Sequence, residues 1–233
     1  TGLPIQKGYN NYYPPEDLEK YEGSRIIEIG VLVTDKNGNI IKAYNSIVKP
    51  DTFTKLDPKI TTITGITNED IINEGKNIKD VFKDIKELFK QGTCLNSYNL
   101  KFDKHVLLSE LYRIHDREFI RIINNLSEEC TLELSRKILY IGSYKLENVY
   151  RELFKEDPAL DKEINPNLRV NLTSKLLSNS FVGNKDNNNG RIKYDGDLKK
   201  KSSFRFSKID NFDNFEPEVI FHDKDIIFFD NKG

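Results

Sequence analysis

The sequence predicts an α/β fold in which helices cover a β-sheet, because strand-like segments come first and strands and helices then alternate. Residues 25–35 (RIIEIGVLVTD) and 40–49 (IIKAYNSIVK) are rich in the β-branched side chains that favour strands. Between them lies Asn37-Gly38, a pair that suits the positive φ angles of a two-residue hairpin turn. We therefore expect these two strands to pair in antiparallel fashion.

Helical segments follow this strand pair. Thr67 and Asp70 are spaced to cap the start of a helix that continues to residue 90, where apolar residues recur at helical spacing. A short strand is expected at residues 93–98. Further helices are expected at residues 102–115, 131–140 and 145–154.

The composition changes along the chain and suggests three parts. Residues 1–154 read as one folded domain, and residues 155–215 as a linker or poorly ordered insertion, with few apolar residues between 178 and 201. Residues 216–233 read as a terminal strand–turn–strand hairpin.

Charge and cysteine content narrow the classes of protein. Lys plus Arg total 36 against 37 Asp plus Glu, so any contact with a polyanion must come from a local patch or a metal site. The apolar runs are too short to span a bilayer, and no secretory signal opens the chain. The two cysteines, Cys94 and Cys130, are too few for a disulfide framework. We expect an intracellular protein with reduced thiols and no membrane partner.

A carboxylate is expected at the edge of the sheet near residue 100. The strand at 93–98 leads to Asn99, and Asp103 follows four residues later at the start of a helix. This geometry aims Asp103 into the crevice at the carboxyl ends of strands, where α/β sheets bind ligands. The alternative is that Asp103 only caps its helix.

The segment SYNLKFDKHVL resembles the second motif of the DEDD-type (DEDDh-like) 3′–5′ exonucleases, which include polymerase proofreading subunits and RNase T. Asn99, Phe102 and Asp103 match this motif, and Tyr98 replaces its usual His. Blocks around residues 25–41, 60–71, 130–139 and 144–153 resemble the same superfamily, so that about residues 1–154 are covered. The resemblance implies an RNase H-like mixed sheet flanked by helices.

Thr1-Gly2-Leu3-Pro4 resembles the end of the first motif of that superfamily, Asp-x-Glu-x-Thr-Gly-Leu-Pro. The motif's Asp and Glu bind two divalent metal ions, and its Thr-Gly-Leu backbone packs on the terminal nucleotide. The resemblance implies that Thr1, Gly2 and Leu3, with Asn99 and Phe102, bind the substrate. It implies that Asp103 is catalytic and a ligand of two Mg²⁺ or Mn²⁺ ions, which need several converging oxygen ligands.

The end of the chain offers a second carboxylate. Residues 226–230 resemble the first strand of the superfamily, which places Asp230 in register with the first metal-binding Asp and Lys232 where the Glu belongs. One reading is a permuted domain that inserts this strand beside the strand at Arg25. The other, which we favour because a Lys repels metal ions, is a reading frame cut from a longer or repeated gene. The absence of Met, including at Thr1, agrees with the second reading.

The third motif, a His followed five residues later by an Asp, is not found after residue 154. His222 has the wrong spacing, and we expect His105 and His115 to be ordinary helix residues. Three tyrosines, Tyr9, Tyr12 and Tyr13, lie close to the first motif; we expect a packed loop there rather than stacking on bases.

The sequence therefore predicts a metal-dependent exonuclease that acts on the 3′ ends of single-stranded DNA or RNA, in a polymerase or larger parent assembly. The alternative is a catalytically inactive or truncated module of the same fold, with a binding or structural role.

Overall fold

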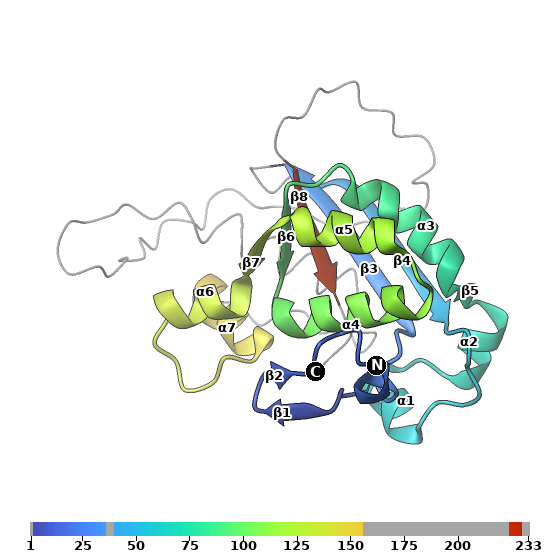
Figure 1. Ribbon diagram of the computed structural model, residues 1–233. Helices are drawn as coiled ribbons and strands as arrows, with labels where there is room; N and C mark the ends of the chain where they lie inside the picture. Colours follow the sequence, from blue (N-terminus) through green and yellow to red (C-terminus); the bar gives the residue numbers. More distant parts are fainter. Residues whose placement is uncertain (1, 36–39, 156–223, 230–233) are drawn as a thin grey trace.

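The computed structural model describes residues 2–35, 40–155 and 224–229 (Figure 1). Its centre is a six-stranded mixed sheet with the strand order β5-β4-β3-β8-β6-β7. The strands are β3 (Glu28–Asp35), β4 (Ile40–Lys49), β5 (Lys76–Asn77), β6 (Cys94–Ser97), β7 (Ser127–Cys130) and β8 (Lys224–Phe229).

The pairing of β3 with β4 is antiparallel and runs from Glu28 opposite Ile47 to Thr34 opposite Ile40, which confirms the predicted strand pair. The predicted turn at Asn37-Gly38 lies outside the described residues. The short strand predicted at 93–98 is confirmed as β6.

The last strand in the sequence occupies a central place in the sheet. β8 pairs antiparallel with β3, with Gly30 opposite Phe229, and parallel with β6, with Asn96 opposite Ile227. The permuted-domain reading gives the C-terminal segment this position, beside the strand that follows Arg25. Residues 155–215 of the predicted linker are described only at Lys155, and of the predicted hairpin at 216–233 only β8 lies within the described residues.

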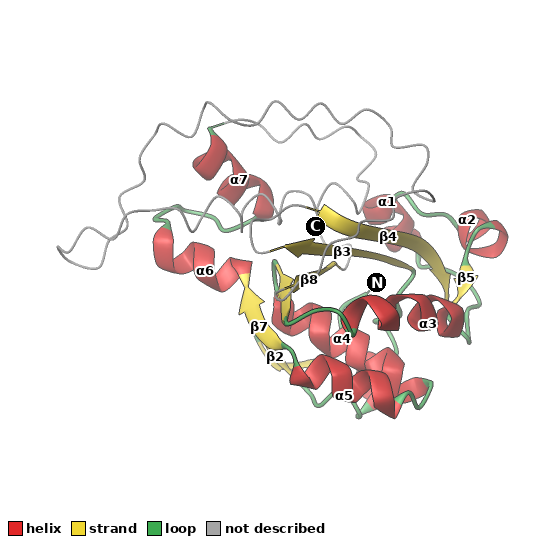
Figure 2. Cartoon of the chain, turned by 90° about the horizontal axis from the view of Figure 1, so that it is seen from above, coloured by secondary structure: helices red, strands yellow, loops and turns green. Residues whose placement is uncertain are grey.

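Helices cover both faces of the sheet (Figure 2). α3, α4 and α5 pack on one face, and α7 packs against the other. The helices are α1 (Pro58–Thr64), α2 (Asn68–Asn73), α3 (Ile78–Phe89), α4 (Leu100–Arg113), α5 (Arg117–Asn125), α6 (Thr131–Ile138) and α7 (Leu146–Phe154). Before the sheet, a small hairpin of β1 (Gln6–Gly8) and β2 (Asn11–Tyr12) precedes a 3₁₀ turn, η1 (Leu18–Tyr21). None of the helices that the structure describes is both long and apolar enough to cross a membrane.

The helix predicted from 67 to 90 is divided into α2 and α3. The cap at its start is confirmed, because the Asp70 amide donates to Thr67 Oγ1 at 3.1 Å and the Thr67 amide donates to Asp70 Oδ2 at 2.7 Å. The break lies at Gly75, where a Cβ atom would come within 2.3 Å of the Ile71 carbonyl oxygen. Asn77 then caps α3 by accepting a hydrogen bond from the Lys79 amide at 2.9 Å.

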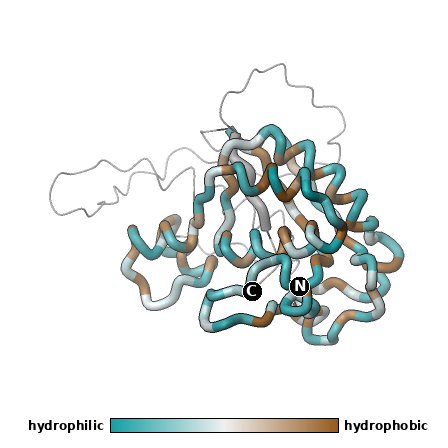
Figure 3. The backbone as a smooth tube through the Cα atoms, viewed as in Figure 1, coloured by the Kyte–Doolittle hydropathy of each residue, from teal (hydrophilic) through white to brown (hydrophobic). Residues whose placement is uncertain are grey.

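The main hydrophobic core lies between the sheet and the layer of α3, α4 and α5. Alternation along β3 decides which side each residue faces: Val31 and Val33 join this core, whereas Leu32 packs on the opposite face with Leu146. Hydrophilic residues alternate with hydrophobic ones along these helices (Figure 3). Phe119 of α5 meets Phe89 of α3 edge-on, with ring centroids 5.0 Å apart.

A buried ion pair fixes α4 to the chain that enters β3. The Glu110 side chain is fully buried and accepts hydrogen bonds from Arg25 Nε at 2.7 Å and from the Ile26 amide at 3.0 Å. A buried carboxylate needs pairing and hydrogen bonds, and Oε1 receives both here, whereas Oε2 lies 4.0 Å from Arg113 Nε. Arg25 also donates to Thr52 Oγ1 at 2.6 Å, which ties the loop after β4 to the same point.

We predict that Glu110→Ala lowers the free energy of unfolding by about 3–5 kcal/mol, because it leaves the Arg25 guanidinium without its buried partner. Urea denaturation measures this change. The control is Glu87→Ala, which removes an exposed pair with Lys90 on α3 and should change stability by about 1 kcal/mol or less. Equal losses in the two variants would contradict the prediction.

We predict that Ile227→Pro destabilises the whole domain, because proline removes a backbone donor from a strand that is paired on both sides. A loss of about 3 kcal/mol or more is expected in a denaturation experiment followed by circular dichroism. Ile227→Val keeps the backbone donor and should retain most of the stability that the proline variant loses. If both variants unfold at the same urea concentration, residues 224–229 are not a central strand.

Candidate active site

The candidate site lies at the edge of the sheet where β4, β6, β7 and β8 end and where β3 begins. This common edge follows from the pairing, because β8 is parallel to β6 and antiparallel to β3. The carboxyl ends of parallel strands are the usual place for ligands of an α/β sheet. Asn99 and α4 follow β6 directly at this edge, as the sequence predicted.

Asp103 lies in the first turn of α4 and is buried, with 5% of its surface exposed. Its Oδ2 atom accepts a hydrogen bond from Ser97 Oγ at the end of β6, where the Ser97 side chain is itself buried. The positive end of the helix dipole also favours a carboxylate there. The N-cap of α4 is Asn99, so Asp103 does not occupy the capping position of its helix.

Tyr12 interacts with the side chains of Asn99 and Asp103, and the sequence did not predict this contact. The centroid of its ring lies 6.0 Å from the ring centroid of Phe102 and 5.3 Å from that of His105, and both residues belong to α4. Burial raises the pKa of Tyr12, the interaction with the Asn99 side chain lowers it, and the Asp103 charge raises it further. With a pKa above its usual value, the Tyr12 hydroxyl keeps its proton at neutral pH and can donate it in a hydrogen bond.

The aromatic side chains near the candidate site differ in how far they are exposed to solvent. Phe102 is 1% exposed and packs in the main core, so it supports the start of α4 from beneath. The expectation of a packed loop is confirmed for Tyr12, which is 8% exposed, and is wrong for Tyr9, which is 89% exposed. Burial lowers the pKa of His105, so its ring is neutral at pH 7 where it meets Tyr12.

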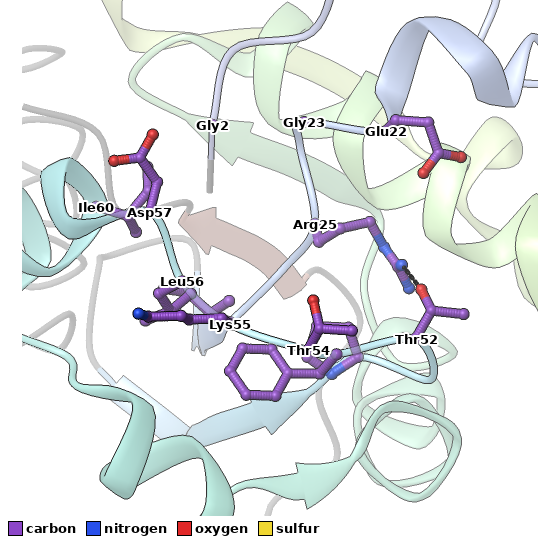
Figure 4. A pocket seen from close by; sticks show the side chains of 13 residues that line it. Gly2, Glu22, Gly23, Arg25, Thr52, Thr54, Lys55, Leu56, Asp57 and Ile60 are labelled. Carbon is purple, nitrogen blue, oxygen red and sulfur yellow. Dashed lines mark hydrogen bonds between the residues drawn. The ribbon is translucent and has the colours of Figure 1, made fainter.

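A pocket of about 300 Å³ opens beside Gly2 (Figure 4). Gly2 and Gly23 form one wall, and Arg25 with the loop after β4 forms another. Glycine is required at position 2, because a Cβ atom there would lie 2.0 Å from the Gly23 carbonyl oxygen. Leu3 follows with 66% of its surface exposed, and Thr1 lies outside the described residues.

The described residues do not by themselves form a metal centre. Across residues 2–35, 40–155 and 224–229, no group of three or more His, Cys, Asp or Glu side chains could hold a metal ion. Asp103 alone does not satisfy a pair of ions that each need several oxygen ligands. The predicted second ligand, Asp230, lies outside the described residues but follows the end of β8 directly in the sequence.

The order of the sheet and the buried Asp103 at its edge fit the exonuclease-like fold that the sequence resembles. The chain belongs to the exonuclease family of the RNase T type, whose model matches residues 15–159. Members of this family generally use divalent metal ions. A search of curated protein sequences gives no match.

Three solved structures of exonuclease I, two of them from Escherichia coli, resemble the chain. The zinc-bound complex with single-stranded DNA has 22% sequence identity and a TM-score of 0.56 over 66% of this chain and 36% of that one. The complex with a dT13 oligonucleotide has 21% identity and a TM-score of 0.53 over 66% and 36%. The product-bound form has 21% identity and a TM-score of 0.53 over 64% and 37%. At these identities the likeness confirms the predicted fold, and the chain spans little more than a third of the length of exonuclease I.

We predict that Ser97→Ala lowers the free energy of unfolding by about 1.5–3 kcal/mol at neutral pH, because the buried Asp103 carboxylate loses a hydrogen bond. The measurement is a double-mutant cycle with Asp103→Ala, followed by urea denaturation. The loss should largely vanish when Asp103 is already absent. Additive losses would show that Ser97 acts independently of the carboxylate.

Proposed function

We propose that the chain is a metal-dependent 3′–5′ exonuclease that hydrolyses phosphodiester bonds at the 3′ ends of single-stranded nucleic acid inside the cell. The observation that carries the proposal is the buried Asp103 at the carboxyl ends of β6 and β8, in a chain of the exonuclease family. A net charge of −1 provides no general attraction for a polyanion, so binding depends on this local site.

Asp103 and Asp230 are the proposed ligands of two Mg²⁺ or Mn²⁺ ions. The support is the register of the sheet: β8 runs parallel to β6, and Asp230 comes next in sequence after the last residue of β8. Bound divalent ions would neutralise charge on the phosphate and activate water. The protein's own contribution is positional, because Ser97 and the first turn of α4 hold the Asp103 carboxylate at the edge of the sheet.

The terminal nucleotide is proposed to bind between the first-motif segment, Thr1 to Leu3, and Asn99. The backbone of Gly2 lies against that of Gly23, and the exposed Leu3 offers an apolar surface for a sugar or base. Asn99 contributes amide donors and acceptors, and the buried Phe102 supports it from the core. The pocket beside Gly2 has polar walls at Arg25 and Thr52.

A second candidate is an exonuclease-like module that binds nucleic acid without hydrolysing it. It is favoured by Lys232 at the position that the resemblance gives to a metal-binding Glu, since a lysine ammonium repels a divalent cation. The two candidates differ in one observable property, which is metal-dependent shortening of the strand.

We predict that 5′-labelled single strands of DNA or RNA are shortened stepwise in Mg²⁺ or Mn²⁺, with a ladder of products, and that EDTA stops the reaction. Asp103→Asn and Asp230→Asn should each lower the rate by about 100-fold or more, the scale on which a positioned catalytic group acts. Asp80→Asn, at an exposed position on α3, is the matched control and should keep the wild-type rate.

Binding of the strand without any shortening would assign the chain to the second candidate. Early release of a 5′-terminal nucleotide would contradict the proposed polarity.

A further inference from the structure

Asn99 begins α4, but its side chain does not cap the helix. At the starts of α1, α2, α3 and α5, the capping side chain accepts a hydrogen bond from an amide of the first turn; these residues are Asp57, Thr67, Asn77 and Asp116. Asn99 occupies the same position, and its side chain makes no such bond. Asparagine is among the best capping residues, so a different partner holds its amide here.

Tyr12 of β2 is that partner. The hydrogen bond with Asn99 lowers the pKa of Tyr12, which is the effect of a donor on a phenol oxygen, so the Asn99 amide nitrogen donates to Tyr12 Oη. Tyr12 is 8% exposed, and a buried hydroxyl is costly unless it is hydrogen-bonded. A phenylalanine would pack equally well on the rings of Phe102 and His105. The hydroxyl is therefore the part of Tyr12 that packing alone does not explain.

The segment that carries Tyr12 is bound to α4 at two points. Near the start of α4, the Tyr12 ring packs on two rings of the helix. Near the end of α4, Arg113 donates to the Leu18 carbonyl oxygen of η1 at 3.0 Å and forms an ion pair with Glu22 at 2.9 Å. With both attachments on one helix, the Tyr12 hydroxyl keeps a fixed position relative to Asn99.

We propose that Tyr12 is a positioning residue of the candidate site, which orients the Asn99 side chain for its contact with the terminal nucleotide. The inference rests on the proposed function, in which Asn99 touches that nucleotide, and it adds a residue from outside the motifs of the family. The torsion that turns a side-chain amide is broad, so an unbound amide would present its nitrogen and oxygen in many directions. With the nitrogen held by Tyr12, the Asn99 oxygen is oriented to accept a hydrogen bond from a sugar hydroxyl.

The first test asks whether the Tyr12 hydroxyl holds the Asn99 amide, and it needs no activity. The side-chain amide signals of Asn99 in a proton–nitrogen NMR spectrum are assigned by their loss in Asn99→Ala. Tyr12→Phe should shift these signals, because an amide proton loses its acceptor. Tyr13→Phe is the matched control, since the Tyr13 ring lies under Lys7 at 4.8 Å, and it should leave the signals in place. Unshifted signals in Tyr12→Phe would overturn the inference.

The second test separates positioning from packing with a double-mutant cycle of Tyr12→Phe and Asn99→Ala. On 5′-labelled oligo-dT in Mg²⁺, Tyr12→Phe should lower kcat/KM by about fivefold, the scale of one hydrogen bond, and should unfold at the urea concentration of the wild type. Added to Asn99→Ala, it should cause no further loss, because its effect passes through Asn99. Tyr13→Phe should keep the wild-type kcat/KM.

The remaining outcomes are also decisive. A wild-type chain that shortens no strand ends the exonuclease proposal, and the Kd for the same oligonucleotide, measured by fluorescence anisotropy, then replaces kcat/KM in the cycle. Losses that multiply in the double variant would show that Tyr12 acts apart from Asn99. That result, a wild-type value in Tyr12→Phe, or a wild-type chain that binds no oligonucleotide would each contradict the positioning role.

Discussion

The structure depends on β8, because this strand joins the two parts of the sheet. β3 with its neighbours β4 and β5 forms one part, and β6 with β7 forms the other. In the observed strand order β8 stands between β3 and β6 and is hydrogen-bonded to both. The helices that build the core pack on residues from both parts, including Val31 of β3 and Leu95 of β6. β8 also ends at the sheet edge where Asp103 lies, so both the sheet and the candidate site depend on this strand.

Asp103 is held by groups that act on α4 from several sides. Ser97 binds its carboxylate from the end of β6, Tyr12 packs on the outer side of the first turn, and Glu110 anchors the later turns to Arg25. Buried carboxylates destabilise a fold unless they are compensated, and rigid placement is what a metal ligand or catalytic group needs. In this arrangement α4 carries two buried acids, Glu110 for anchoring and Asp103 facing the sheet edge.

The sequence was most informative where a pattern is local. β-branched runs predicted β3 and β4, helical spacing predicted α3, and the motif around Asn99 and Asp103 predicted the strand-to-helix turn at the sheet edge. Prediction missed the break at Gly75, which depends on a close approach to the Ile71 carbonyl, and it missed α5 and β7. The role of Tyr12 could not be predicted, because it arises from a packing contact across more than 80 residues of sequence.

The pairing of β3 with β8 joins residues that are about 200 positions apart in the chain. Contacts of such long range close slowly, because the entropy of a large loop must be lost before any pairing is gained. During synthesis, β3 and β6 therefore each keep an unpaired edge until residues 224–229 leave the ribosome. Unpaired edges of this kind promote association between chains, so slow translation or a missing C-terminal segment should favour aggregation of the nascent protein.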